Sequence, residues 1–387
     1  MKNKTNIIYV IATLLFVTSC VTPFEPEGYE QLENILVIEG DINTSGKTEV
    51  IVSRSLKLGD ISKRNYVKGA SVWVESETGL KYTAYQYITG QEARYITGYN
   101  YLASDKRYKL CVITPDGKQY ESELVKPLIP PPVESVEFVT DTTLMEVTFY
   151  VNTSDPANKT HYYKWTYVED WEFTAHKYAN FEYNPLTFKM EEIPYYSNKY
   201  YCWNRSDSKS ILIYSTTHLT EDRVYRMPLV KMGPDDLRIS LLYSIEVIQQ
   251  ALTKEAYQYW ENLRKNSDQL GGIFSPQPSE MRGNIKCVSD PEEIVLGYIS
   301  AGTFVKKRFM ASKSEINLYW DDHVCEIIIP EKAVPMPIPW STMHEDGYVP
   351  ISYNPSERES VWVLKECADC RTKGTKNKPS FWPNNHF

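Results

Sequence analysis

Short segments of alternating apolar and polar residues recur between Asn34 and Lys126, and turn residues separate them. Residues 70–75 and 108–114 show the alternation most clearly, while 77–79 and 115–118 carry glycine or proline turn signals. Because successive side chains on a strand point to opposite faces, this pattern predicts strands that are buried on one face. Strands spaced by about ten residues, with turns between them, are typical of a β-sandwich. We therefore expect an N-terminal β-sandwich over residues 34–126.

A proline-rich stretch marks the end of this unit. The three consecutive prolines at 130–132 cannot donate backbone hydrogen bonds and favour an extended chain, so residues 127–133 are predicted to link two domains. Residues 134–387 again show strand patterns, with expected strands that include 210–214, 237–245 and 295–301. The sequence therefore predicts a mainly β protein, in which a larger β-rich C-terminal domain ends in a cysteine-containing tail.

One main α-helix is predicted in the C-terminal domain, near residues 253–270. Thr253 is a favourable N-cap, and Gly271-Gly272 ends the helical pattern. The apolar side chains between them follow helical spacing, so we expect Tyr257, Trp260 and Leu263 to pack the helix against the second sheet.

The first twenty residues have the pattern of a bacterial lipoprotein signal. Lys2 and Lys4 precede an apolar run over 7–17, and the small residues Thr18 and Ser19 stand directly before Cys20. We expect residues 1–19 to be removed as a signal peptide and Cys20 to carry lipid. The acidic, proline-containing residues 20–33 would then form a stalk between the membrane and the folded chain. An ordinary secreted protein with a chance cysteine is the alternative.

Composition and motifs narrow the classes of function. The formal net charge is -8, which argues against nucleic acid as a partner. The sequence has no nucleophile elbow, zinc-protease motif, P-loop or dinucleotide-binding glycine pattern, and its six histidines are scattered. The group Asp321-Asp322-His323 is interpreted as a turn between strands rather than a metal site. We expect no catalytic residue, no metal and no cofactor, and hence a protein that is not an enzyme.

Apart from Cys20, six of the seven cysteines are available for up to three disulfides, with 15 possible connectivities. Cys367 and Cys370 are separated by two residues, and a structural disulfide is favoured. A zinc site would need two more ligands, and no second CxxC or paired histidine supplies them, while a redox motif would need a strand-to-helix context that is missing here. Cys202 and Cys287 flank one long segment and are the other candidate pair. Cys111 lies within an apolar strand and is expected to be a buried free thiol.

An irregular stretch over 176–203, with Trp171 just before it, is unusually rich in aromatic residues. Tyrosine and tryptophan faces stack on sugars or on peptide side chains, so this stretch is the candidate ligand-binding surface. The residues selected for it are Trp171, Tyr178, Tyr183, Tyr195, Tyr196 and Trp203. The alternative is that these side chains pack a long loop onto the sheet.

Several blocks of the sequence carry family resemblances. The succession of Gly69-Ala70, Val72, Val74 and the strand at 108–114 resembles prealbumin-like or fibronectin-like modules. Over nearly the whole mature chain the sequence also resembles the lipoproteins of the Bacteroidota domain-of-unknown-function family 4249. The blocks that carry this second resemblance are the lipobox with 23–26 and 36–40, the helix at 256–263 with 272–278 and 283–285, residues 290–298, and 367–371 with 378–382.

This resemblance implies a protein of the outer membrane, lipid-anchored at the cell surface or the periplasmic face, whose gene often neighbours a TonB-dependent receptor. It implies ligand capture or an accessory role in a TonB-dependent nutrient transporter. The family has no established catalytic residues to transfer to this chain. A structural or adhesive surface protein without a transport role is the alternative, and an enzyme of an unfamiliar class is a third possibility.

Overall fold

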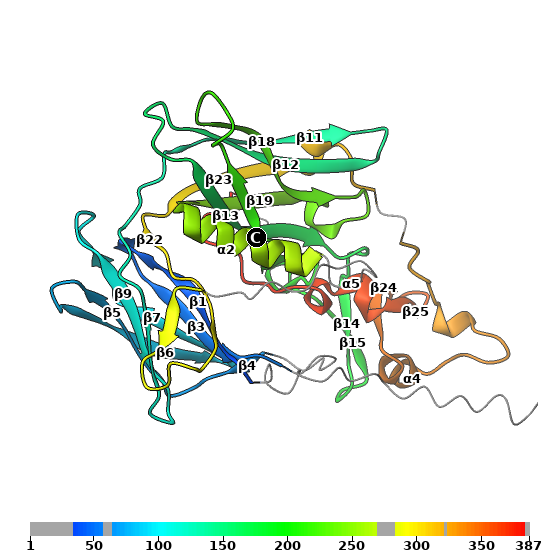
Figure 1. Ribbon diagram of the computed structural model, residues 1–387. Coiled ribbons are helices and arrows are strands. Elements are labelled where there is room, and N and C mark those ends of the chain that lie inside the picture. Colours follow the sequence, from blue (N-terminus) through cyan, green and yellow to red (C-terminus); the bar gives the residue numbers. More distant parts are fainter. Residues whose placement is uncertain (1–33, 57–63, 269–282, 321–322, 384–387) are drawn as a thin grey trace, which may run out of the picture.

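The computed structural model describes residues 34–56, 64–268, 283–320 and 323–383. The protein is mainly β, and its strands form two large units with a smaller C-terminal lobe beside the second (Figure 1). The predicted signal peptide, Cys20 and the stalk at 20–33 lie outside the described residues. Within the described residues, no helix combines the length and apolar character needed to cross a membrane.

The first unit is one continuous sheet that runs in the order β20-β10-β9-β5-β6-β7-β3-β1-β21, with β4 paired to β3 and β22 to β1. Hydrogen bonding therefore does not divide these strands into the two separate sheets that the sandwich prediction expected. A short separate ladder joins β2 to β8. The strands are β1 (Leu36–Asn43), β2 (Ser45–Gly46), β3 (Glu49–Arg54), β4 (Asn65–Tyr66), β5 (Ser71–Ser76), β6 (Lys81–Thr89), β7 (Glu92–Thr97), β8 (Asn100–Tyr101), β9 (Tyr108–Ile113), β10 (Gln119–Ser122), β20 (Ile285–Cys287), β21 (Val295–Leu296) and β22 (Ala301–Gly302).

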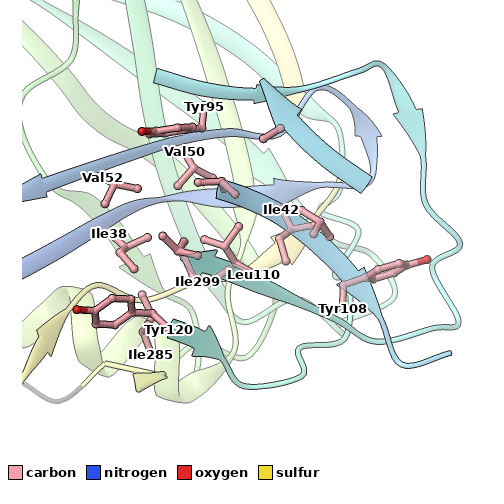
Figure 2. Packing of buried hydrophobic residues seen from close by; sticks show 14 of the residues in the cluster. Ile38, Ile42, Val50, Val52, Tyr95, Tyr108, Leu110, Tyr120, Ile285 and Ile299 are labelled. Atoms are coloured by element: carbon pink, nitrogen blue, oxygen red, sulfur yellow. The ribbon is translucent and has the colours of Figure 1, made fainter. Parts of the chain in front are cut away.

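The predicted domain boundary at 126 is wrong in one respect, because residues 285–302 return to complete the first unit. In this segment β20 pairs with β10, and β21 and β22 pair parallel with β1. Ile285 and Ile299 point into the same apolar cluster as Ile38 and Leu110 (Figure 2). The side chain of Asn284 hydrogen-bonds both the N–H and the C=O of Ile299 at 2.8 Å, which holds the two ends of this segment together.

Two glycines allow this returning segment to fold tightly. Gly297 has φ +140°, and a Cβ there would lie 2.1 Å from the Ile38 carbonyl oxygen. A Cβ on Gly283 would lie 1.6 Å from the Gly297 carbonyl oxygen. The backbones approach so closely that side chains do not fit between them.

Gly297→Ala is therefore expected to lower the free energy of unfolding by more than about 2 kcal/mol, because it combines a strained φ with a clash against backbone. Gly117→Ala is the matched control, since Gly117 also has positive φ (+85°) but has open space around it. We expect the control to lower the free energy of unfolding by only about 1 kcal/mol. Denaturant unfolding of both variants measures the difference, and equal losses would contradict the role given to close backbone approach.

The predicted linker at 127–133 is held between the units rather than free. Leu128 donates a backbone hydrogen bond to Ala301 of the returning segment at 2.9 Å and accepts one from Thr303, just after that segment, at 3.0 Å. The Pro131 carbonyl accepts a hydrogen bond from the Gln249 side chain in the second unit. This stretch therefore fixes the relative position of the two units.

The second unit consists of two sheets packed face to face. The three-stranded sheet has the order β11-β12-β18, and the larger sheet has the order β16-β13-β19-β23 with β17 beside β13. Phe149 and Tyr243 come from opposite sheets, and their ring centroids lie 4.8 Å apart in the shared core. The strands are β11 (Val133–Asp141), β12 (Glu146–Ser154), β13 (Tyr162–Thr174), β16 (Tyr201–Asp207), β17 (Leu212–Ser215), β18 (Arg223–Met232), β19 (Leu242–Ala251) and β23 (Val305–Ser312). The short helices η3 (Leu237–Ile239) and α3 (Lys313–Ile316) flank β19 and β23, so the strand predicted from 237 begins later, at Leu242.

The predicted helix is confirmed as α2 (Lys254–Asp268), which lies between the two units in Figure 1. The Thr253 side chain accepts a hydrogen bond from the Ala256 N–H, as expected of an N-cap. Tyr257 packs on Tyr162 of β13, and Tyr259 packs on Tyr298 of the returning segment. The helix thus contacts the second sheet, as predicted, and the first unit as well.

A buried ion pair also joins the units. Lys164 Nζ of β13 lies 2.9 Å from Asp41 Oδ2 of β1, and the two side chains are only 11% and 8% exposed. Asp41 also accepts hydrogen bonds from Gln250 and from the Ser300 N–H. The Lys164 ammonium further lies 4.0 Å from the ring centroid of Trp260 on α2. This cluster connects both units and the helix.

The C-terminal lobe, on the right of Figure 1, is built from two hairpins and short helices. The stretch at 176–203 that was expected to be irregular contributes one hairpin and reaches β16. The elements of the lobe are β14 (Phe181–Asn184), β15 (Lys189–Glu192), η2 (Tyr195–Ser197), η4 (Pro330–Lys332), α4 (Trp340–Glu345), β24 (Tyr348–Asn354), β25 (Glu359–Leu364), α5 (Lys365–Ala368) and η5 (Cys370–Thr372).

Candidate functional site

A cavity of about 400 Å³ lies in the C-terminal lobe. Its walls come mainly from β14, the start of β24, α5 and η5. Ligand pockets commonly measure about 300–1,000 Å³, so this space suits a small molecule. The residues that line it are Ala179, Phe181, Glu182, Tyr183, Ile193, Lys199, His344, Gly347, Tyr348, Val349, Pro350, Lys365, Ala368, Asp369 and Arg371.

The two hairpins beside the cavity have the same kind of turn. Asn184 and Asn354 each begin an Asn-Pro turn, and their side-chain oxygens accept backbone N–H groups two residues further on. The residues that end the turns, Phe188 and Arg358, have φ of 57° and 52°. Asparagine favours such turns because its side chain replaces a backbone acceptor, and the proline fixes φ.

Two disulfides hold the wall formed by α5 and η5, and their pairing corrects the sequence prediction. Cys202 on β16 is joined to Cys370, and Cys325 is joined to Cys367. The predicted pairs Cys202–Cys287 and Cys367–Cys370 are therefore both wrong. Cys367 packs in a cluster with Val363, whereas Cys370 packs with Phe173, so the two neighbouring cysteines belong to different clusters.

Cys111 and Cys287 are free and buried, as expected for Cys111. Burial raises the pKa of the Cys111 thiol to about 12. A chain of residues 20–387 with Cys20→Ser is expected to show almost no thiol reactivity at pH 8 while folded, because the Cys111 thiol is protonated and both thiols are inaccessible. Titration with a chromogenic disulfide in denaturant should then count the two free thiols. A count of four or more would contradict the pairing.

The cavity carries charged side chains from several elements. Lys199 Nζ lies 2.8 Å from Glu182 Oε2, and the Arg371 guanidinium donates two hydrogen bonds to Asp369, at 2.8 and 2.7 Å. Burial raises the pKa of the Asp369 carboxyl, but the hydrogen bonds from Arg371 outweigh it and hold the pKa below its usual value. Asp369 is therefore ionised and fixes the orientation of Arg371.

The six aromatic residues predicted to bind ligand do not form one surface. Trp203 and Tyr183 are buried, at 3% and 7% exposure, and Trp171 is half-buried against two clusters. Tyr178, Tyr195 and Tyr196 are exposed. Of the six, only Tyr183 lines the cavity. Packing within the fold thus explains the burial of Trp203 and of much of Trp171. The charged residues of the cavity were not predicted from the sequence, because they are widely separated in the chain.

One group of potential metal ligands occurs within the part of the chain that the structure describes. His323, Cys325 and Cys367 have ligand atoms within 4.8 Å of one another, and the His323 ring stacks on that of His176. The disulfide joins both cysteines, so neither is a thiolate able to bind a metal ion. Asp321 and Asp322, interpreted with His323 as a turn, lie outside the described residues.

These features define a mainly β, disulfide-stabilised protein with a small-molecule-sized cavity beside its second β unit. The sequence pattern of the family described as Domain of unknown function (DUF4249) matches residues 21–308. The chain belongs to this family. None of the curated proteins matches the chain.

Two solved structures have low similarity to this chain. The "Cytokine receptor complex - Crystal form 2" has 10% identity and a TM-score of 0.20, and the match covers 55% of this chain and 90% of that chain. A DUF4785 family protein from Legionella pneumophila subsp. pneumophila has 8% identity and a TM-score of 0.19, with 55% of this chain and 52% of that chain covered.

Proposed function

We propose that this protein is a lipid-anchored, non-enzymatic outer-membrane protein that captures a small ligand in the cavity of its C-terminal lobe. The observation that supports capture is the construction of the cavity. Both disulfides attach the segment that contains Lys365, Asp369 and Arg371 to other parts of the fold. A wall that is fixed before the ligand arrives loses less conformational freedom on binding.

The anchor is proposed on Cys20, from the signal-like pattern at 1–19. Structural disulfides are typical of proteins outside the cytoplasm, which agrees with export. Labelling cells with a clickable palmitate analogue should mark the wild-type chain and leave Cys20→Ala unmarked. An unmarked wild-type chain would refute the anchor.

The proposed partner is a TonB-dependent receptor, to which the protein would pass its ligand as an accessory subunit. The test is co-purification of the tagged protein from detergent-solubilised outer membrane, followed by identification of bound proteins. We expect a TonB-dependent receptor in near-equal amount, and a matched purification of an unrelated lipoprotein should lack it. Recovery without any transporter would favour the structural or adhesive alternative.

A further inference from the structure

We infer that the cavity of the C-terminal lobe binds small organic anions, in which a carboxylate, sulfonate or phosphate group is joined to an apolar ring or chain. The inference rests on the proposed capture function and specifies the chemistry of its ligand. It depends on two properties of the lining: a guanidinium fixed in place with a nitrogen left free, and apolar side chains beside it.

Arg371 supplies the fixed guanidinium. Its Nε and Nη2 both donate to Asp369, whose side chain is only 5% exposed. Among the residues that the structure describes, no acceptor contacts Arg371 Nη1. Arginine binds carboxylate and phosphate oxygens through such N–H groups, and a preset orientation reduces the entropy lost on binding.

Further basic side chains line the same cavity. The basic side chains of the lining are Lys199, Lys365 and Arg371, whereas its acidic side chains are Glu182 and Asp369. Two of the cations are paired with these carboxylates, and the Lys365 ammonium has no ion-pair partner among the described residues. The lining is thus cationic in a chain whose net charge is -8.

The rest of the lining is apolar. Ile193, Val349 and Pro350 present aliphatic surface, and Phe181 and Tyr183 present rings. Apolar surface contributes binding free energy through burial, while a few charged groups set orientation and specificity. Together these walls match a ligand with one anionic end and one apolar end.

The test compares two fluorescent probes with nearly the same ring system: anionic 8-anilinonaphthalene-1-sulfonate and uncharged N-phenyl-1-naphthylamine. The protein is the mature chain with Cys20→Ser, so that no detergent is needed. The charge variant is Lys199→Gln/Lys365→Gln. Its matched control is Lys209→Gln/Lys254→Gln, which removes two exposed lysines away from the cavity. Val349→Trp fills the cavity from β24 and tests whether the probes occupy it.

We expect the sulfonate to bind the parent protein about tenfold more tightly than the neutral probe. The charge variant should lose about tenfold in affinity for the sulfonate and keep its affinity for the neutral probe, while the control changes neither. Val349→Trp should weaken the binding of both probes. If the parent protein bound both probes with equal affinity, or if the charge variant kept full affinity for the sulfonate, the anion inference would be overturned. The cavity would still be a binding site in that case. Failure of both probes to bind, or binding unaffected by Val349→Trp, would overturn the capture proposal as well.

Discussion

Replacing Cys202 and Cys370 with alanine is expected to lower the free energy of unfolding by about 4 kcal/mol and to weaken ligand binding in the cavity. The bridge joins residues separated by 168 positions, and a disulfide that closes a long loop removes the most entropy from the unfolded chain. Its loss also frees η5, which carries Arg371. Denaturant unfolding and probe titration measure the two effects.

Cys111→Ala/Cys287→Ala is the matched control for this variant. It also truncates two buried cysteines, but these carry no bridge. We expect the free energy of unfolding to fall by about 2 kcal/mol, because each truncation leaves a small void in the core, and we expect unchanged binding of the probes. If both double variants lost the same stability and bound probe equally well, the bridge would have no role in holding the cavity wall.

Asp41→Ala is expected to destabilise the protein by about 3–5 kcal/mol. The substitution leaves the Lys164 ammonium nearly buried without its partner carboxylate, and it removes the acceptor of Gln250 and of the Ser300 N–H. An unpaired buried charge costs far more than the loss of a surface ion pair. The free energy of unfolding is measured with denaturant, and the unfolding of each unit is followed by its own signal.

Glu39→Ala provides the matched control on the same strand. Glu39 pairs with Arg64, and both side chains are more than 40% exposed, so we expect a loss of at most about 1 kcal/mol. Adding Lys164→Met to Asp41→Ala should recover part of the stability, because the unpaired charge is then removed. A loss from Asp41→Ala no larger than that from Glu39→Ala would show that the two units are not coupled through this pair.

Local patterns predicted much of the secondary structure. The N-cap at Thr253 and the apolar spacing after it located α2, and alternation over 70–75 and 108–114 located β5 and β9. The helix and the strands could be predicted because residues close together in the sequence determine these patterns. The turn residues likewise marked where strands end.

Long-range pairing could not be predicted in the same way. The segments β21 and β22 have two residues each, too few to show a period, and their partner β1 lies more than 250 positions away. The spacing of Cys367 and Cys370 suggested a local bridge, but α5 and η5 direct the two sulfurs into separate clusters. Only the folded arrangement brings Lys199 near Arg371, so the candidate site was beyond sequence reasoning.

Ligand capture is tested most directly by identifying small molecules that co-purify with the protein. The wild-type protein and Val349→Trp would be purified in parallel from native cells under mild conditions, and their extracts compared by mass spectrometry. We expect an anionic organic compound, near-equal in amount to the wild-type protein and strongly depleted in the variant with the filled cavity. Identical extracts from the two proteins would contradict ligand capture in this cavity.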